Sequence, residues 1–356
     1  MSIESIFNQF NHEGVFQKAE VIESGHINTT ILIRTLSSAS PDYVLQRINS
    51  NVFKNIPDLI KNKVLVTDFL RTKVQVQENI IRLIPTKSGE YYFVDTNNDY
   101  WNLMVFIFDS RVYLKAPNTK IAEEAGRLYG QFFYLLNDFE SEKLTETIPR
   151  FHDMHYRLNQ FESAIKRARD KRLESAKASV EFVNKNKAEI LVLQKLKDKG
   201  KLPLRVTHND TKLSNALFDK NEKAIAVIDL DTLMPGLVHY DFGDSVRTIC
   251  SSAEEDDGDL SKVYFLTENF EAFAKGFLHS CKSILLKDEI KSLVLGTKYM
   301  VFIMGLRFLT DYLNNDIYYK IKYTEHNLIR AKNQFALLKS MKLHEREMQK
   351  IIQKTI

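Results

Sequence analysis

The stretch VTHNDTKLSNALFDKNEKAIAVIDLD, residues Val206 to Asp231, decides how the rest of the chain is interpreted. It holds His208, Asp210 and Asn215 in the pattern H-x-D-x-x-x-x-N, and Asp229 follows fourteen residues after the asparagine. Transfer of a phosphoryl group from ATP needs a carboxylate that orients the attacking hydroxyl, and oxygen ligands that hold magnesium on the phosphates. One Asp, one Asn and a second Asp at these spacings predict that chemistry.

The same stretch predicts a β-hairpin that would bring its polar side chains together. Residues 216–218 and 223–228 have the apolar composition of two short strands, and the polar residues 219–222 between them are typical of a turn. Such a hairpin would return Asp229 to a place beside Asn215, and two oxygen ligands suit Mg²⁺, which takes few ligands from proteins. Asp and Asn are also common turn residues, and a single one would indicate only a turn. Four polar residues at these spacings favour a kinase-type site.

Length and composition describe an ordinary globular protein. The 356 residues suffice for two lobes, with 44% hydrophobic and 27% charged residues. The net charge of +4 is small and does not indicate a nucleic-acid partner. Two cysteines exclude a disulfide framework and suit a reducing cytoplasm. No apolar run is expected to approach the length of a membrane span, and the N-terminus lacks the pattern of a signal peptide. We therefore expect a cytoplasmic protein without a membrane partner, as a monomer or weak homodimer.

Strand signals concentrate before residue 110, and helical signals follow it. We expect strands at residues 17–23, 30–35, 43–48, 91–95 and 101–108, with one helix at 57–71. Helical spacing is found at residues 121–136, 161–199, 267–285, 290–313 and 325–352. These patterns predict an α+β, bilobal, protein-kinase-like fold with a small antiparallel-sheet N-lobe (1–110) that binds nucleotide. The larger, mainly helical C-lobe (111–356) would carry the catalytic loop and bind the sugar.

Two segments of the N-terminal half are candidates for nucleotide binding. The segment SGHIN lies between the first two expected strands, where kinases cover the ATP phosphates, and Gly25 and Asn28 are its candidate contacts. It has a single glycine, so a plain hairpin turn is the alternative. Phe106 and Ile107 lie at the passage into the helical half, where backbone groups would hold adenine, although a simple core strand would have the same composition.

Arg47, near the end of the third strand, is a candidate for binding the phosphates. Kinases place a lysine on this strand for the α- and β-phosphates, and an arginine fork also matches phosphate geometry. An exposed residue at a strand end is the alternative. The usual acidic partner lies on the next helix, where Asp58 and Asp68 are the candidates.

Two further features of the helical half leave alternatives open. Lys212, two residues after Asp210, either contacts the transferred phosphoryl group or is a solvated loop lysine. The motif DFGD at 241–244 looks like the magnesium motif of kinases, but it lies too far beyond Asn215, and Asp229 already fills the position at the strand end. Its acids could instead brace the catalytic loop or face the substrate.

Together these segments resemble the N-acetylhexosamine 1-kinases, within the aminoglycoside phosphotransferase superfamily. The HxDxxxxN pattern alone indicates only the superfamily. The resemblance implies a bilobal kinase-like fold, ATP and Mg²⁺, and transfer to the anomeric hydroxyl of GlcNAc or GalNAc. The matching segments are SGHIN (24–28), YVLQRIN (43–49), TIPRFHD (147–153), HNDTKLSN (208–215), IDLDTLMPG (228–236), DFGD (241–244) and RFLTDYLNND (307–316).

The resemblance also implies roles for single residues. Asp210 would be the base, while Asn215 and Asp229 would hold magnesium. Arg307 stands four residues before Asp311 on an expected helix, so an ion pair within the helix is the alternative to a substrate contact. The residues implied to line the sugar pocket are His26, Asp210, Asp231, Arg307 and Tyr318.

Three other functions were weighed against this one. A related kinase could act on choline, a methylthioribose-like sugar or an aminoglycoside, but cationic substrates call for an acidic pocket, which Arg307 argues against. A catalytically dead nucleotide-binding scaffold would lack a catalytic residue, whereas Asp210, Asn215 and Asp229 are all present. A metal-dependent hydrolase using His208 would need further histidines at metal-binding spacing, and the sequence shows none.

Overall fold

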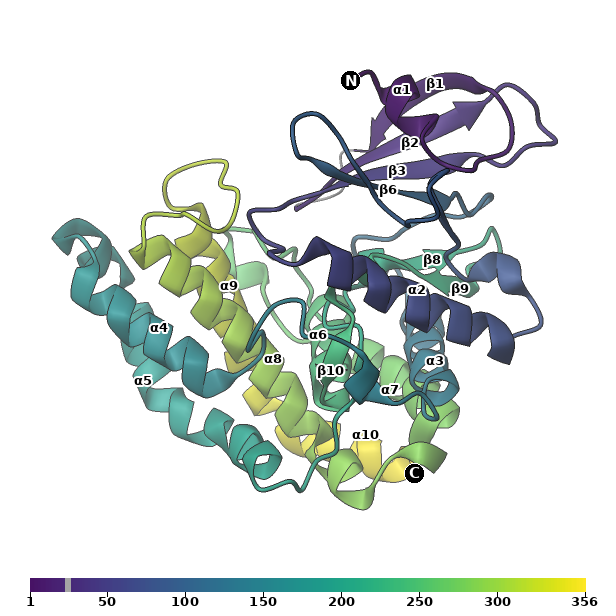
Figure 1. The fold of residues 1–356 in the computed structure, drawn as a ribbon. Helices are drawn as coiled ribbons and strands as arrows, with labels where there is room; N and C mark the ends of the chain where they lie inside the picture. Colours follow the sequence, from purple (N-terminus) through teal and green to yellow (C-terminus); the bar gives the residue numbers. More distant parts are fainter. Residues whose placement is uncertain (23–26) are drawn as a thin grey trace.

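A computed structural model describes residues 1–22 and 27–356, and it shows a small sheet-based lobe beside a larger helical lobe (Figure 1). The bilobal α+β fold expected from the sequence is therefore confirmed. Gly25 and His26, predicted to contact nucleotide and sugar, lie outside the described residues.

The small lobe is built on one antiparallel sheet of six strands. The order of the strands is β1-β2-β3-β6-β4, and β5 pairs with β6. Tyr43, Leu45 and their neighbours bury one face against the short helix α1 (Ile3–Phe7). The strands are β1 (Phe16–Ile22), β2 (Thr29–Thr35), β3 (Tyr43–Ile48), β4 (Leu83–Ile84), β5 (Phe93–Val94) and β6 (Tyr100–Val105).

Helix α2 (Ile56–Lys73) joins the two lobes. Its apolar residues form one core with the sheet and with Leu230 and Leu233 of the catalytic region. Asn62 strengthens this connection, because its Nδ2 donates to the carbonyl oxygen of Leu233 at 2.8 Å. In Figure 1, α2 runs below the sheet and crosses the view in front of the strands β8 and β9. A change in the position of α2 would therefore affect both the sheet of the small lobe and the region around Leu230 and Leu233.

The larger lobe is a helical assembly around α8 (Lys287–Leu313), which packs against α4, α5, α6 and α9. Most of α8 is apolar and buried, so this helix supplies the centre of the core. The other helices are α3 (Thr119–Leu135), α4 (Met154–Arg167), α5 (Asp170–Asp198), α6 (Val238–Ile249), α7 (Thr267–Cys281), α9 (His326–Leu343) and α10 (Glu345–Thr355).

Two of the expected long helices are each interrupted. The stretch 161–199 spans the end of α4 and all of α5, because Ala168 and Arg169 are extended and let the chain turn back (Figure 1). The stretch 325–352 is divided at His344, after which α10 packs against α7 while α9 packs against α8. A single straight helix could not reach both partners, so tertiary packing overrides the continuous helical pattern.

Helix α8 also corrects the expectation about apolar runs. It is 27 residues long, and its most apolar window has a mean hydropathy of 1.4, so by length and composition alone it could cross a membrane. However, 83% of that window is buried inside the protein. The central helix of a large soluble core has the same composition, and its burial here favours that interpretation.

The catalytic stretch forms two small two-stranded sheets. Strands β8 (Ala216–Phe218) and β9 (Ala224–Val227) make the predicted hairpin, which is confirmed. Just before it, β7 (Arg205–Thr207) pairs with β10 (Met234–Gly236), and α6 follows directly. None of β7, β10 and α6 was predicted from the sequence; the two strands have three residues each, too few to show a period.

Candidate active site

The hairpin places Asn215 directly beside Asp229. The backbone N–H of Ile228 donates to the carbonyl oxygen of Asn215 at 2.9 Å, which fixes the two strand ends to each other. Asp229 has a φ of 61°, in the left-handed region that costs most residues about 1 kcal/mol or more. Such strain persists only where surrounding contacts hold it, and it is frequent at functional sites. The backbone of the hairpin thus brings these two residues next to each other, as the sequence predicted.

Asp210 lies in the same place, and its side chain is half-buried, with 32% exposed. Lys212 Nζ donates to Asp210 Oδ2 at 2.8 Å, and Asn215 Nδ2 donates to the same oxygen at 3.1 Å. Burial acts to raise the pKa of Asp210, but the charge and hydrogen bond of Lys212 outweigh it and lower the pKa to about 2. The carboxylate is therefore ionised at neutral pH, and it can accept a hydrogen bond from a hydroxyl brought next to it. Lys212 contacts the carboxylate instead of pointing freely into solvent.

Asp241, the first residue of DFGD, holds the catalytic loop from behind. Its two carboxylate oxygens accept the backbone N–H groups of His208 and Asn209, each at 2.7 Å. Asn209 has a φ of 65°, so this loop too has a left-handed residue that needs support. Burial raises the pKa of Asp241 to about 7, although both hydrogen bonds act to lower it. Of the two roles considered for these acids, bracing the loop is the one observed. Asp244 instead pairs with Arg247 at 2.8 Å.

The hairpin offers the ligands that a magnesium ion needs. Because Asn215 uses its Nδ2 on Asp210, its Oδ1 is left to bind a cation beside the Asp229 carboxylate. Burial and the charge of Asp231 raise the pKa of Asp229 to about 6, while Lys212 and Lys63 act to lower it. A carboxylate crowded by other carboxylates gains from a bound cation. Among the described residues no three His, Cys, Asp or Glu side chains gather as a metal cluster. The amide oxygen of Asn215 and the carboxylate of Asp229 are two ligands, and so small a set fits Mg²⁺, which keeps waters and phosphate oxygens as its other ligands.

Asp231, predicted to contact the sugar, is engaged with the small lobe. Its Oδ1 forms a buried ion pair with Lys63 Nζ, and its Oδ2 accepts a hydrogen bond from Asn28 Nδ2. Asn28, predicted to contact the nucleotide, also accepts the backbone N–H of Asn49 at 2.9 Å through its Oδ1. These two predicted residues are thus brought together, and their side chains connect the lobes.

Arg47 lies on the outer side of its strand. Its side chain is 44% exposed, and its guanidinium pairs with Asp99 at 3.2 Å and lies over the ring of Trp101. The two acids proposed as its partners on the next helix are bound locally instead. Asp58 accepts a hydrogen bond from Asn55, and Asp68 pairs with Arg71.

Phe106 and Ile107 follow the end of β6, at the passage to the larger lobe. The backbone N–H of Phe106 donates to the carbonyl oxygen of Asp42 at 2.9 Å. The hydroxyl of Ser110 donates to the carbonyl oxygen of Ile107 at 2.7 Å. An adenine ring held here would have to use other backbone groups of the segment, so the role of these two residues stays a prediction.

Arg307 and Tyr318 meet in a hollow of about 460 Å³ between α4, α8 and residues 317–319. The guanidinium of Arg307 lies 4.6 Å from the ring centre of Phe151 and 5.8 Å from that of Tyr318. Asp311 does not pair with Arg307, because its carboxylate accepts the backbone N–H groups of residues 317–319. We call this space the acceptor hollow.

The acceptor hollow is connected to the catalytic loop through His152. His152 Nε2 lies 3.3 Å from the carbonyl oxygen of Asn209, and the preceding Phe151 contacts Arg307. A second guanidinium is close by. Burial, followed by the charge of Arg307, lowers the pKa of Arg157 to about 10. The buried Arg307 and the partly buried Arg157 therefore line the same space.

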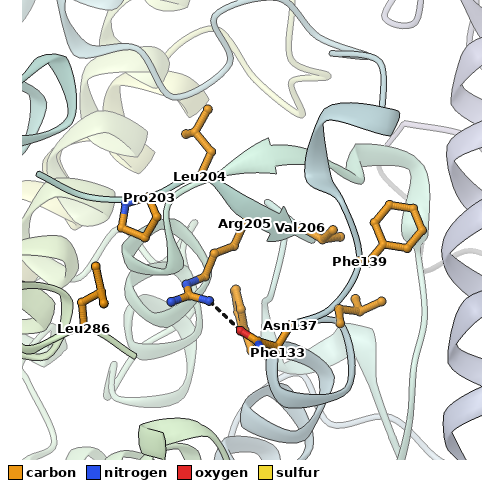
Figure 2. Close-up of a pocket in the computed structure, with 9 residues that line it drawn as sticks. Phe133, Asn137, Phe139, Pro203, Leu204, Arg205, Val206 and Leu286 are labelled. Atoms are coloured by element: carbon orange, nitrogen blue, oxygen red, sulfur yellow. Dashed lines mark hydrogen bonds between the residues drawn. The ribbon is translucent and has the colours of Figure 1, made fainter. Parts of the chain in front are cut away.

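A second, smaller hollow of about 220 Å³ lies at the start of β7 (Figure 2). Figure 2 shows Arg205 reaching Asn137, with Leu286 and Phe139 among the lining residues. The guanidinium of Arg205 is already bound to Glu289 at 2.8 Å and to Asn137 at 3.1 Å. Its donors are therefore engaged in holding the helices together, and this hollow has an apolar, structural character.

Several residues of this region were not predicted from the sequence. Gln46, Lys63, His152 and Arg157 were assigned no role. A signal for Lys63 was present, because it occupies the inward face of α2 at helical spacing from Leu59, Val66 and Leu70, which are all buried. His152 and Arg157 had no comparable signal, since their partners are distant in the sequence.

Comparison with known proteins agrees with this arrangement. Residues 18–267 match the model of the phosphotransferase enzyme family, and the chain belongs to that family. Among solved structures, the chain is similar to a microcompartment-associated aminopropanol kinase, with 14% identity, 97% of each chain covered and a TM-score of 0.67. It is also similar to a spectinomycin phosphotransferase in complex with ADP and spectinomycin (12% identity, 97% and 98% covered, TM-score 0.59). A choline kinase from Cryptosporidium parvum Iowa II gives 14% identity, 93% and 91% covered, and a TM-score of 0.58. Likeness at this level establishes the shared kinase-like fold.

Proposed function

We propose that this protein is an ATP- and Mg²⁺-dependent kinase that phosphorylates the anomeric hydroxyl of N-acetylhexosamines, GlcNAc or GalNAc. Residues 1–110 would bind the nucleotide, and residues 111–356 would carry the catalytic loop and the sugar. ATP is supported by the family and by the hairpin, and the choice of the 1-position follows the resemblance of the motifs.

The charge of the acceptor hollow carries the choice of substrate class. Aminopropanol, choline and many aminoglycosides carry a cationic nitrogen, for which a pocket needs free carboxylates or free aromatic faces. In the hollow, Arg307 lies over the rings of Tyr318 and Tyr319, and Arg157 lies over Tyr156. The protein's own guanidinium groups thus occupy the aromatic faces that a cationic acceptor would use. A neutral acceptor with carbonyl and hydroxyl oxygens is the better match, because guanidinium groups donate hydrogen bonds to such oxygens.

The catalytic residues would act by positioning and charge. The acceptor oxygen would attack the γ-phosphorus, the bond from that phosphorus to the β-γ bridging oxygen would break, and ADP would leave. Asp210 would hold the acceptor hydroxyl by a hydrogen bond and take its proton. A carboxylate with a low pKa suffices for this, because the transition state is loose and depends little on a strong base. Bound magnesium would offset charge on the phosphates, held by Asn215 and Asp229.

The test is a panel of acceptors incubated with the protein, ATP and Mg²⁺, with release of ADP as the readout. We expect turnover with GlcNAc or GalNAc and little with glucosamine, choline or aminopropanol. Methyl N-acetylglucosaminide, which is blocked at O1, should not be phosphorylated, and the product of the free sugar should lose its reducing end. Turnover that is greatest with a cationic acceptor would contradict the sugar assignment, and phosphorylation of the methyl glycoside would contradict the 1-position.

A further inference from the structure

The residue that follows Gln46 in β3 faces away from the catalytic site. Arg47 is 44% exposed, and its guanidinium is bound to Asp99 and to the hydroxyl of Thr29. Successive side chains of a strand point to opposite faces, so Gln46 points inward, and it is buried. The inward position of this strand therefore holds a neutral amide, with the neighbouring cation on the other face.

The cation on the inward side comes from helix α2. Lys63 Nζ donates to Gln46 Oε1 at 3.2 Å, and Asn102 Nδ2 donates to the same oxygen at 3.2 Å. The ammonium also forms the ion pair with Asp231, and only 2% of the Lys63 side chain is exposed. Gln46 thus serves as a neutral support that fixes the direction of a lysine from the helix opposite.

Lys63 is close to the expected metal and phosphate position. Its partner Asp231 stands two residues after Asp229 in the chain. Lys212, whose ammonium is hydrogen-bonded to Asp210 at 2.8 Å, is a second cation beside the same stretch. A nucleotide whose phosphates approached Asn215 and Asp229 would bring several negative charges beside the ammonium of Lys63. Lysine is well suited to such a site, since its ammonium is a compact charge on a flexible stem.

We propose that Lys63 of α2, supported by Gln46, supplies the cation that binds the nucleotide phosphates, and that its ammonium turns from Asp231 to the phosphates when nucleotide binds. This inference rests on the proposed kinase function. In this arrangement the helix provides the cation and the strand provides its neutral partner. Release of Asp231 by Lys63 would also free a buried carboxylate oxygen to accept a hydrogen bond from a sugar hydroxyl, so nucleotide binding would prepare the acceptor site.

The test compares the binding of ADP and of adenosine, with Mg²⁺ and without acceptor, by isothermal titration calorimetry. The variants are Lys63→Met, the double variant Lys63→Met/Asp231→Asn, Arg47→Gln, and Lys61→Met as a matched control on the exposed face of α2. The double variant removes both charges of the buried pair, so it avoids leaving one carboxylate unpaired, which is strongly destabilising. Circular dichroism of each variant checks the fold.

We expect Lys63→Met and the double variant to weaken ADP about 10–100-fold while adenosine affinity is unchanged, because a charged hydrogen bond to phosphate is lost. Lys61→Met should bind both ligands as the wild type does.

Recovery of ADP affinity in the double variant would show that Lys63 only neutralises Asp231. Equal weakening of ADP and adenosine binding would show that Lys63 has a general structural role. A loss confined to ADP in Arg47→Gln, with Lys63→Met unaffected, would assign the contact to β3. Each of these three results overturns the proposal. If wild-type protein itself binds ADP no better than adenosine, the kinase function fails as well.

Discussion

The catalytic hairpin and the acceptor hollow are built in opposite ways. In the hairpin and the loop before it, Asp210, Lys212 and Asn215 lie within six residues, and Lys212 and Asn215 both donate to Asp210. In the hollow, Arg157 comes from α4 and Arg307 from α8, and the Asp311 carboxylate that also lines it is bound to backbone N–H groups. The hairpin and its loop thus gather carboxylate and amide oxygens, whereas the hollow is lined by guanidinium groups.

This difference separates the residues that would act on every acceptor from the residues that would select one acceptor over another. A phosphoryl group is transferred by the same residues whatever hydroxyl attacks, so changes in the hairpin should lower turnover for every acceptor alike. Changes in the hollow should alter the order of preference among acceptors. The following predictions use this contrast.

The largest effect is expected for Asp229→Ala. Loss of one of two protein ligands should prevent productive binding of Mg²⁺ and lower kcat at least about 10³-fold, since a metal ion supplies several kcal/mol of charge stabilisation. ADP release should fall equally with every acceptor, and excess EDTA should abolish wild-type activity. Asp219→Asn, in the turn of the same hairpin, is the matched control and should stay active. Full wild-type activity in EDTA would contradict the role of the metal.

The second-largest effect on turnover is expected for Asp210→Asn. The amide keeps the shape of the side chain but cannot accept the hydroxyl proton, and a positioned base is typically worth about 10²–10⁴ in rate. We expect a kcat loss in that range, with the affinity for ATP largely retained, measured by steady-state kinetics and calorimetry. The loss should again be the same for GlcNAc and for any weaker acceptor. Turnover near that of the wild type would remove Asp210 from the mechanism.

The same contrast explains what the sequence could predict. The hairpin was predictable because its residues have fixed spacings within one stretch, and the turn at 219–222 closes it locally. Five strands of the six-stranded sheet were predicted, including the stretch 91–95 that contains β5, whereas the two-residue strand β4 was missed. The orientation of Arg47 was not predictable, because two adjacent polar residues on a strand, Gln46 and Arg47, do not reveal which one faces inward.

Helical packing was the least predictable part of the site. The hollow depends on how α4 crosses α8 and on where residues 317–319 fold back onto Asp311. Neither contact leaves a periodic signal. The resemblance named Arg307 and Tyr318 but could not indicate Arg157, and nothing in the local pattern around His152 shows that its ring meets the catalytic loop.

Arg307→Met should change selectivity rather than turnover. Methionine keeps most of the length and the contact with the rings, but it removes the charge, and a hydrogen bond to a charged group is worth about 1.5–3 kcal/mol. We expect KM for GlcNAc to rise about 10–100-fold while KM for ATP is unchanged, and the disadvantage of glucosamine to shrink. Lys166→Met, on the exposed side of α4, is the control. An equal loss of kcat for all acceptors would contradict the division between the two regions.

The smallest effect concerns His152, the residue that joins the two regions. Burial, together with the charges of Arg307 and Arg157, holds the pKa of His152 well below its usual value, so the ring is neutral in the folded protein. In the unfolded chain a histidine takes up a proton near pH 6.5. The folded state is therefore disfavoured as the pH falls below that value, and this contribution to stability is complete above it.

Between pH 7.5 and 5.5 one such group should lower the free energy of unfolding by about 1.4 kcal/mol. His152→Gln, which cannot titrate, should lose about that much less than the wild type over the same interval, measured by urea denaturation at the two pH values. The other histidines contribute equally to both proteins and cancel in the difference. An unchanged pH dependence in the variant would show that the fold does not lower the pKa of His152, and that the positive charge of the acceptor hollow does not extend to the catalytic loop.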